Sequence, residues 1–505
     1  MNIGLVIGIV IILALAALFS VLTCKSKTSD LFKWLGIAMF VAFCLTWVIP
    51  YGYFSAGTFY DYGMSRLGLS DIPTLLYYAL YFCITTVIYL LVIGGFYGVF
   101  SKTKAYSALV NKFADSIKGK EVLTTILTIV ILVCLTSVLK SALCLVVFLP
   151  FLVSVLLKAK YDKLTATGIT FGSLLVGMLG ATYGTEGLVY FNSYLESVKM
   201  SDGIIYRLIL GVMALVLFVL YNVYRTVKIV KKNKKAENMD DAFAVEEVKE
   251  KTRIWPAIVV FSLLFVFIIL GYIGWNTSFG LQFFDNIHKS VTELSFFKVS
   301  GEDFKIFNLI LGTSSKAFGM MDTTTLIVVM LFMTLLVSVM NRVSVKDTMN
   351  NFGEGFMKMV KPATLYTLAY VIFIVIYLDP FTATISDWLF GLTKSFNPYT
   401  TMLTSFITSI FHQDLGYTSY LLGTVLTTTY KEYFELAHTI FIFMYGFVQV
   451  FMPTSCLLLV GLSYMKVDYK SWFKYIWMFA VAMVVVLIIF VSIVMYLIPW
   501  IQTLI

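Results

Sequence analysis

The stretch from Glu121 to Lys163 constrains the fold most, because neither its length nor its flanks fit an ordinary membrane span. It is almost entirely apolar and is interrupted once, in the middle, by TSVLKSA. About 20 helical residues cross a bilayer core, so the stretch is too long for one span and each half is short for one. Both flanks are rich in lysine, which is typical of cytoplasmic loops. The sequence therefore predicts a re-entrant hairpin over 122–157 that enters and leaves on the cytoplasmic side.

Composition places the whole chain in the membrane. Of 505 residues, 60% are hydrophobic and only 13% are charged, with a mean hydropathy of +0.90, which excludes a soluble domain. The net charge of +9 lies in loops between apolar runs and so does not indicate a nucleic-acid partner. The six cysteines show no CxxC or framework spacing and are interpreted as buried apolar residues. The first apolar run, Ile3 to Leu22, lacks a basic start and a cleavage site, so we expect a retained span rather than a signal peptide.

The predicted fold is an all-α polytopic membrane protein with about 10 transmembrane helices and two re-entrant hairpins. The N-terminal half, 1–224, contains the first hairpin and a broken helix over 164–191. A charged cytoplasmic linker over 225–253 leads to the C-terminal half, 254–505, with a second hairpin over 400–429 and a broken helix over 436–465. In this arrangement 27 of the 37 Lys and Arg residues lie in inner loops, nine lie outside or at the outer interface and one, Lys140, lies inside a hairpin.

The order of hairpin and broken helix occurs twice, in opposite orientations. The flanks of the second hairpin have no basic excess, so it opens outward, and the breaks are at GATYGTEG in the first half and QVFMPTS in the second. Such a pattern is typical of inverted-repeat transporters, which bind substrate at the midplane between the repeats. Half-helix N-termini exposed at the breaks favour anionic groups. The alternative is that these Gly and Pro residues are simply common in membrane helices.

A family resemblance follows from three segments: LVIGGFYGVFSKTKAYSALVNKF, YDKLTATGITFGSLLVGMLGAT and VQVFMPTSCLLLVGLSYMKVDYKSWFKYI. They resemble YfcC-like transporters, a basic amino-acid antiporter and C4-dicarboxylate-carrier-like branch of the ion transporter superfamily. The resemblance implies a homodimer with a scaffold domain and a transport domain that moves by an elevator motion. The sequence departs from that family at both hairpin tips, which read LTSVLKSA and HQDLGYTS.

Lys140 is the sharpest candidate for the substrate or ion site, because lysine at mid-membrane costs about 2.5–3.5 kcal/mol on an insertion scale. We interpret it as a ligand of a substrate carboxylate or a replacement for a sodium ion; the alternative is a shallow hairpin from which it reaches the interface. Glu186 is its expected counter-charge unless it lies at the outer mouth. His412 and Asp414 are candidates for amine or proton handling, although a lone His is often structural. The complete predicted site is Thr136, Ser137, Lys140, Ser141, Thr182, Tyr183, Thr185, Glu186, His412, Gln413, Asp414, Tyr417, Thr418, Gln449, Thr454 and Ser455.

These residues favour a secondary transporter for an amino acid such as arginine or ornithine, since buried charges of both signs suit a zwitterion or cation. A carrier of mono- or dicarboxylates is the alternative, and an ion channel is an alternative of another class. The sequence contains no HExxH, GxSxG or Walker A motif, so no enzyme is predicted. We expect no metal and no cofactor, with H⁺ or Na⁺ coupling left open. The predicted partners are a small-molecule substrate, the lipid bilayer and a second copy in the bacterial plasma membrane, with the C-terminus outside.

Overall fold

The structure is a computed structural model. It describes residues 30–55, 57–184, 201–230, 245, 252–299, 302–312, 315–393, 395–412, 415–428 and 431–497. In these ranges helices dominate, and the strands form two separate antiparallel hairpins. The prediction of an all-α polytopic membrane fold is confirmed, since nine helical segments in the described ranges are long and apolar enough to cross a membrane. They are Ile72–Phe100, Glu121–Val138, Lys163–Gly180, Ile204–Lys228, Trp255–Tyr272, Thr323–Met340, Val360–Leu378, Lys431–Met465 and Tyr469–Tyr496.

The N-terminal region is described from Asp30 onward, so the predicted first span, Ile3 to Leu22, lies outside the described residues. Helix α2 (Asp30–Leu45) has 16 residues. An antiparallel hairpin of β1 (Tyr51–Ser55) and β2 (Thr58–Gly63) follows, and then the turn η1 (Leu69–Asp71) and the long α3 (Ile72–Phe100).

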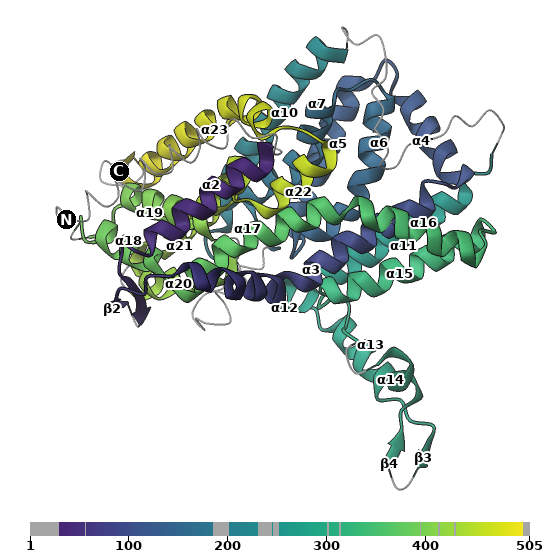
Figure 1. The fold of residues 1–505 in the computed structure, drawn as a ribbon, viewed down its shortest axis with the longest axis horizontal. Coiled ribbons are helices and arrows are strands. Elements are labelled where there is room, and N and C mark those ends of the chain that lie inside the picture. Colours follow the sequence, from purple (N-terminus) through teal and green to yellow (C-terminus); the bar gives the residue numbers. More distant parts are fainter. Residues whose placement is uncertain are drawn as a thin grey trace, which may run out of the picture.

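Helix α3 packs against a bundle from the other half of the chain, made of α15 (Thr323–Met340), α16 (Val345–Lys358) and α17 (Val360–Leu378). Figure 1 shows that α3 and these three helices run along the long axis of the molecule. At the α3–α16 crossing the backbones nearly touch, because Gly94 and Gly98 face Gly355. A Cβ on any of these three glycines would meet backbone atoms of the opposite helix. Close approach through small residues is the usual way in which membrane helices pack tightly.

The segment predicted as the first hairpin consists of two helical parts separated by a short break, an arrangement called helix–break–helix below. Helix α4 (Lys104–Ile117) precedes α5 (Glu121–Val138), and the short 3₁₀ segment η2 (Ala142–Phe148) continues into α6 (Leu149–Lys158). The two ends of the segment meet, since the Tyr161 hydroxyl donates to the Glu121 carbonyl at 2.7 Å. The break at Leu139–Ser141, where the backbone is extended at both residues, is therefore at the far end. One detail differs from the prediction: α5 has 18 residues and is itself long enough to cross a membrane. How deeply the hairpin enters the membrane therefore stays a prediction.

The next helix is continuous in direction but irregular, running through α7 (Lys163–Thr167), the π-turn η3 (Gly168–Gly172), α8 (Ser173–Gly177) and η4 (Met178–Gly180). It ends at Gly180, the first residue of the predicted break GATYGTEG, and residues 185–200 lie outside the described part. Helix α10 (Ile204–Val230) returns and extends six residues into the predicted linker 225–253. Most of the remaining linker lies outside the described residues.

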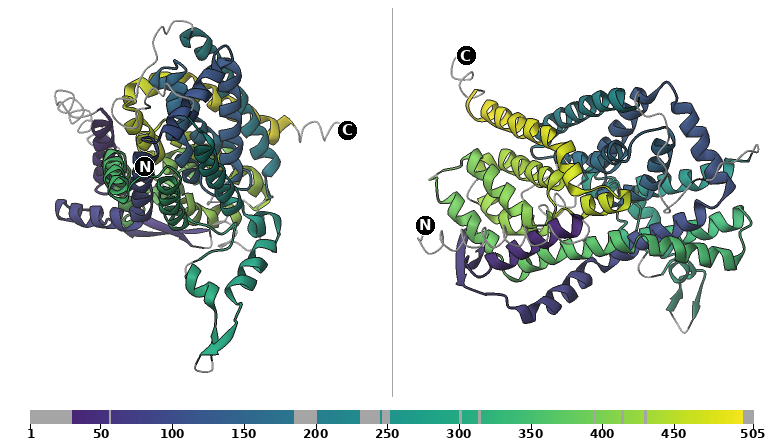
Figure 2. Two further views of the ribbon diagram at one scale, coloured as in Figure 1. Left: turned by 90° about the vertical axis from the view of Figure 1, so that its right-hand side faces the viewer. Right: turned by 45° about the horizontal axis from the view of Figure 1, so that its top comes forward.

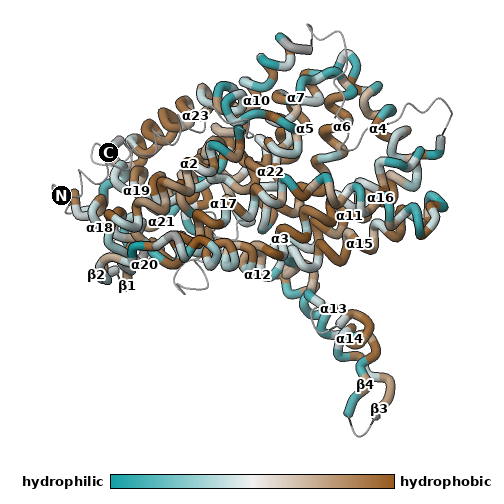
Figure 3. The backbone as a smooth tube through the Cα atoms, in the orientation of Figure 1, coloured by the Kyte–Doolittle hydropathy of each residue, from teal (hydrophilic) through white to brown (hydrophobic). Residues whose placement is uncertain are grey.

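A module between α11 (Trp255–Tyr272) and α15 protrudes from the helical body, as Figures 1 and 2 show. It consists of α12 (Trp275–Phe279), α13 (Phe283–Thr292), the β3–β4 hairpin (Phe297–Val299, Glu302–Phe304) and α14 (Ile306–Leu311). Figure 3 shows that hydrophobic and hydrophilic positions alternate along this module, whereas the body is predominantly hydrophobic.

The second half of the predicted repeat pattern is also helix–break–helix. Helix α18 (Phe381–Phe390) leads to α19 (Pro398–Phe411) and α20 (Leu415–Thr428). The short η5 (Lys431–Tyr433) precedes α21 (Phe434–Phe451), which stops before Pro453, and α22 (Cys456–Met465) restarts the helix. The interruption at Met452–Ser455 lies within the predicted break QVFMPTS. Helix α23 (Tyr469–Ser492), with the π-turn η6 (Ile493–Leu497), is the last described element.

Candidate functional site

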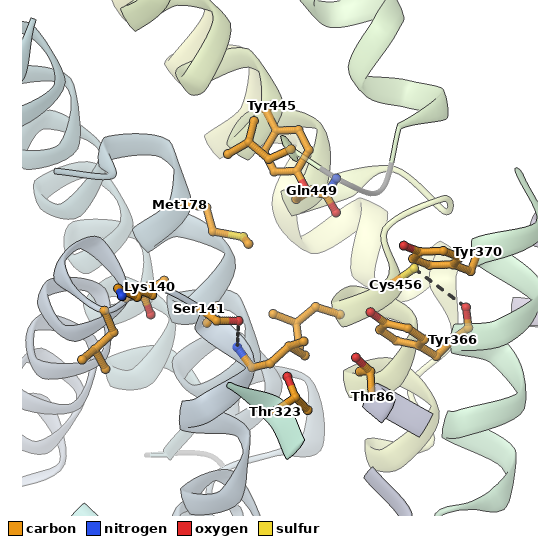
Figure 4. Close-up of a pocket in the computed structure, with 16 residues that line it drawn as sticks. Thr86, Lys140, Ser141, Met178, Thr323, Tyr366, Tyr370, Tyr445, Gln449 and Cys456 are labelled. Carbon is orange, nitrogen blue, oxygen red and sulfur yellow. Dashed lines mark hydrogen bonds between the residues drawn. The ribbon is translucent and has the colours of Figure 1, made fainter. Parts of the chain in front are cut away.

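A cavity of about 240 Å³ lies between four places in the chain: the break of the first hairpin at Leu139–Ser141, the end of the irregular helix at Met178, the start of α20 and the start of α22. The first hairpin contributes its break, α8 ends beside it, and α20 and α22 begin there, while α3, α15, α17 and α21 complete the wall (Figure 4). Its volume is below the ~300–1,000 Å³ of pockets that hold drug-sized ligands, so it suits a small solute. The lining residues that carry side-chain oxygen, nitrogen or sulfur are Thr86, Thr136, Lys140, Ser141, Met178, Thr323, Tyr366, Tyr370, Tyr445, Gln449 and Cys456.

Three helical segments start at this cavity. Ala142, Leu415 and Cys456 are the first residues of η2–α6, α20 and α22, and all three line it. The N–H groups of a first helical turn have no partner within the helix, and they give the N-terminus a partial positive charge. Ser141 and Ser455 each cap one of these starts by accepting from the backbone N–H of Leu143 and Leu458, both at 3.4 Å. The arrangement aims backbone donors at one small space and thereby favours an anion there.

Two lining side chains have buried polar atoms without a hydrogen-bond partner in the described part of the chain: the Thr136 hydroxyl and the Gln449 amide nitrogen. The hydroxyl of Thr454, at the α21–α22 break, is in the same situation. Thr136, Gln449 and Thr454 are 2%, 4% and 2% exposed. Because a buried polar group without a partner is destabilising, such groups indicate a water molecule or ligand.

Lys140 lies in the cavity wall, but its ammonium group is engaged elsewhere. It donates to the carbonyl of Gly319 and lies 3.8 Å from the sulfur of Met320, both in the loop before α15. Figure 4 shows its nitrogen at the edge of the group of lining side chains. The prediction that Lys140 binds a substrate carboxylate stays a prediction.

Ser137 and Thr182 do not line the cavity and instead tie the end of α5 to the end of α8. The Ser137 hydroxyl donates to the Gly180 carbonyl at 2.6 Å, and the Thr182 hydroxyl donates to the Ser137 carbonyl at 3.0 Å. The Thr182 N–H also donates to that carbonyl at 2.9 Å. These bonds fix the first break against the end of the irregular helix, which positions Thr136 and Ser141 at the cavity.

Replacing Ser137 by alanine is expected to destabilise the protein by about 1–2 kcal/mol, because the Gly180 carbonyl loses its hydroxyl donor at a buried helix end. The measurement is the thermal unfolding midpoint in detergent, which should fall by a few degrees. Ser173→Ala is the matched control, since the Ser173 hydroxyl is buried but donates only to Ile169 within its own helix. Equal midpoints for the two variants would show that this tie contributes nothing specific.

His412 is fully buried at the end of α19, between two threonines rather than in the cavity. Its Nε2 lies 3.0 Å from the Thr382 hydroxyl, and its Nδ1 lies 2.8 Å from the Thr418 hydroxyl. Tyr417 packs edge-on against Phe373 of α17. These contacts join the second hairpin to α17 and α18.

The other predicted residues do not line the cavity or lie outside the described ranges. The Tyr183 ring packs at a tilt against Phe279, with ring centroids 4.9 Å apart, and its carbonyl accepts from the Ser278 hydroxyl. Thr185, Glu186, Gln413 and Asp414 lie outside the described residues, so their roles stay predictions. In the described ranges no cluster of three or more His, Cys, Asp or Glu side chains is arranged to hold a metal ion.

Sequence reasoning missed the tyrosines of the cavity wall. Tyr366 and Tyr370 lie one turn apart on α17, and Tyr445 is on α21, all within runs that otherwise read as plain membrane helix. Thr86, in α3, and Cys456, directly after the Pro-Thr-Ser break, were missed for the same reason. The only available signal was polarity at positions inside long apolar runs, and this signal does not separate packing tyrosines from lining ones.

Comparison with known proteins adds a family assignment. The model of the family described as DcuC, C4-dicarboxylate anaerobic carrier, matches residues 5–413. Among solved structures, the YdaH transporter of Alcanivorax borkumensis matches with 11% identity over 92% of this chain and 97% of that chain, at a TM-score of 0.38. No match was found among curated proteins. The narrower likeness to YfcC-like antiporters stays a prediction.

Proposed function

Because the chain belongs to the DcuC family of C4-dicarboxylate anaerobic carriers and is a multi-pass membrane transporter, we propose that it carries a small dicarboxylate across the membrane. The substrate binds in the 240 Å³ cavity between the two breaks. The bacterial plasma membrane is its proposed location, with the linker on the cytoplasmic side.

The convergence of three helical starts on one hydroxyl-rich cavity is the observation that supports an anionic substrate best. The cavity lining in the described ranges includes Lys140 and no Asp or Glu. A dicarboxylate requires compensation for two negative charges, which backbone N–H groups at helix starts and hydroxyl donors supply without a fixed cation. The partnerless Thr136 hydroxyl and Gln449 amide are further donors.

The mechanism that we propose is alternating access of the elevator type. The two helix–break–helix segments hold the substrate between their ends, and the domain that contains them slides past a scaffold formed by the tightly packed α3–α16 crossing. A homodimer joined through the scaffold and the inverted repeat of the two halves belong to this proposal. The duplicated order of hairpin and broken helix supports it.

Arginine or ornithine exchange is the competing hypothesis. Its expected carboxylates, Glu186 and Asp414, lie outside the described residues, whereas a cationic substrate would require acidic groups at the cavity. The experiment therefore has to distinguish exchange of basic amino acids from transport of a dicarboxylate. The channel hypothesis is separated by the same experiment, because carriers show counterflow and saturation.

Counterflow in proteoliposomes tests the proposal. Vesicles preloaded with succinate, malate, arginine, ornithine or buffer receive trace labelled succinate or arginine outside. We expect labelled succinate to accumulate only in vesicles loaded with a dicarboxylate, and labelled arginine to remain flat. Accumulation of arginine driven by internal arginine or ornithine would replace the dicarboxylate with an amino acid, and uptake that neither saturates nor shows counterflow would indicate a channel.

A further inference from the structure

Asp379 is a completely buried carboxyl group at the junction of α17 and α18. It follows the last residue of α17, Leu378, and precedes Pro380, after which α18 begins. Its side chain is 0% exposed, and neither carboxyl oxygen has a hydrogen-bond partner among the described residues. None of the ion pairs found in the described ranges includes it. The cavity is lined by other residues, so Asp379 is a feature separate from the substrate site.

The surroundings disfavour a charged carboxylate at this position. Burial of an ion without a partner is unfavourable, which shifts the equilibrium of the carboxyl group toward its protonated form. The C-terminal end of α17 increases this effect, because the last carbonyls of a helix present partial negative charge. Burial raises the pKa of the Asp379 carboxyl to about 6, although the Ser65 hydroxyl beside it acts to lower the pKa. No hydrogen bond of ordinary geometry joins these two groups.

The carboxyl group is nevertheless close to the surface. Ser65, in the segment after β2, is itself exposed, and its hydroxyl lies beside the Asp379 carboxyl group. A proton therefore has a short path to the carboxyl group through this segment.

A chain of hydrogen bonds joins the Asp379 segment to the second hairpin. Phe381 packs edge-on against Phe411, the last residue of α19, with ring centroids 5.5 Å apart. The next residue, Thr382, bonds to His412, which in turn bonds to Thr418 of α20. The α17–α18 junction is thereby in contact with α19 and, through His412, with α20, whose first residue Leu415 lines the cavity.

We propose that Asp379 is the proton-binding site that couples transport to a proton gradient, through the contacts of α18 with α19 and α20. In the coupled step a hydrated proton is transferred to one carboxyl oxygen, which forms an O–H bond and leaves water, and the reverse step returns the proton to water. The neutral group fits the buried junction, whereas the anion requires water or a cation, so the two forms favour different positions of the junction. The inference rests on the transport function proposed above.

Other titratable groups lie on the elements around this junction. Of these, only His412 ordinarily titrates near neutral pH, and both of its ring nitrogens are held by threonine hydroxyls. Asp379 differs from His412 in that its carboxyl oxygens have no hydrogen-bond partner among the described residues. The other groups include Tyr51, Tyr53, Tyr60, Asp61, Tyr62, Arg66, Tyr377, Asp387, His412 and Tyr417.

The test compares wild type with Asp379→Asn in proteoliposomes, with Asp387→Asn, later on the same helix α18, as the matched control. Labelled succinate uptake is driven by an imposed pH gradient, by an imposed Na⁺ gradient, or by counterflow without any gradient. We expect wild type and Asp387→Asn to accumulate succinate under the pH gradient, and Asp379→Asn to lose this accumulation at least 10-fold while counterflow persists. Unchanged pH-driven accumulation in Asp379→Asn would overturn the inference, and so would wild-type accumulation driven by Na⁺ and not by pH.

A measurement on the unmodified protein guards against a variant that fails to fold. Dicyclohexylcarbodiimide reacts with protonated carboxyl groups in apolar surroundings, and mass spectrometry locates the adduct. We expect an adduct at Asp379 at pH 5.5 that decreases at least several-fold at pH 8.0, and labelling that is absent or equal at both values would contradict the inference. Absence of succinate counterflow in wild type would instead refute the proposed substrate, and the labelling result would still decide the proton site.

Discussion

The Gly355→Leu variant is expected to yield no stably folded protein. A side chain at position 355 would project into the backbone of α3 at Gly94 and Gly98, and no movement of a flexible side chain relieves that contact. Overpacking in a well-packed core costs about 1–3 kcal/mol or more, and here the two helices themselves have to separate. Because α3 is central to the packing of α15, α16 and α17, we expect a loss at or above the upper end of that range.

The measurement for this variant is the yield of monodisperse protein in detergent, together with the thermal unfolding midpoint. Gly353→Leu is the matched control, because Gly353 lies on the same helix and a Cβ there would meet nothing within 4 Å. The control should purify and unfold like wild type. Wild-type behaviour of both variants would mean that the α3–α16 crossing is looser than the structure shows.

Gln449→Leu is expected to separate transport from stability. The Gln449 amide nitrogen is buried at the cavity without a partner in the described ranges, so its donor capacity is available to a substrate carboxylate. A hydrogen bond to a charged group contributes about 1.5–3 kcal/mol, so its removal should raise KM for succinate by roughly 10- to 100-fold. Stability should stay equal or rise, because leucine removes a buried polar group that lacks a partner.

The assays for this variant are initial rates of uptake against succinate concentration and the thermal midpoint of the same preparation. Thr439→Val serves as the control on α21, since the Thr439 hydroxyl donates to Glu435 within the same helix and does not reach the cavity. It should leave KM within about twofold of wild type, a change of less than about 0.5 kcal/mol. Unaltered KM in Gln449→Leu would remove Gln449 from the substrate site, and a large loss of stability would assign it a packing role.

The helices and the second break were predictable because local properties determine them. Apolar runs of about 20 residues specify spans, and Pro453 cannot donate the backbone hydrogen bond that would continue α21. The polar run TSVLKSA likewise specified the first break, which the structure places at Leu139–Ser141. In each of these cases the deciding property lies within a few residues of the chain.

The residues that line the cavity were harder to predict, because the lining depends on contacts between distant segments. Lys140 stood out as a charge in an apolar run, but its bond to Gly319 spans 179 positions and leaves no local pattern. Tyr366 and Tyr370 line the cavity only because of how α17 is rotated about its axis, which its neighbours determine. Thr136 and Gln449, which the sequence singled out because each is polar and lies at or near a break, do line the cavity, and their part in binding stays a prediction.

The cavity wall is contributed by segments as far apart as Thr86 and Leu457, which has a consequence for biosynthesis. A nascent chain emerges from the ribosome N-terminus first, so the break at Leu139–Ser141 is made long before the helix start at Cys456 that faces it. Until α21 and α22 have been synthesised, they cannot cover the polar backbone of this break. Lipid cannot replace them, because it offers no hydrogen-bond partners to backbone N–H and C=O groups. Ribosomes that stop short of position 457 should therefore release chains that the cell's membrane quality-control proteases remove, however many spans those chains already contain.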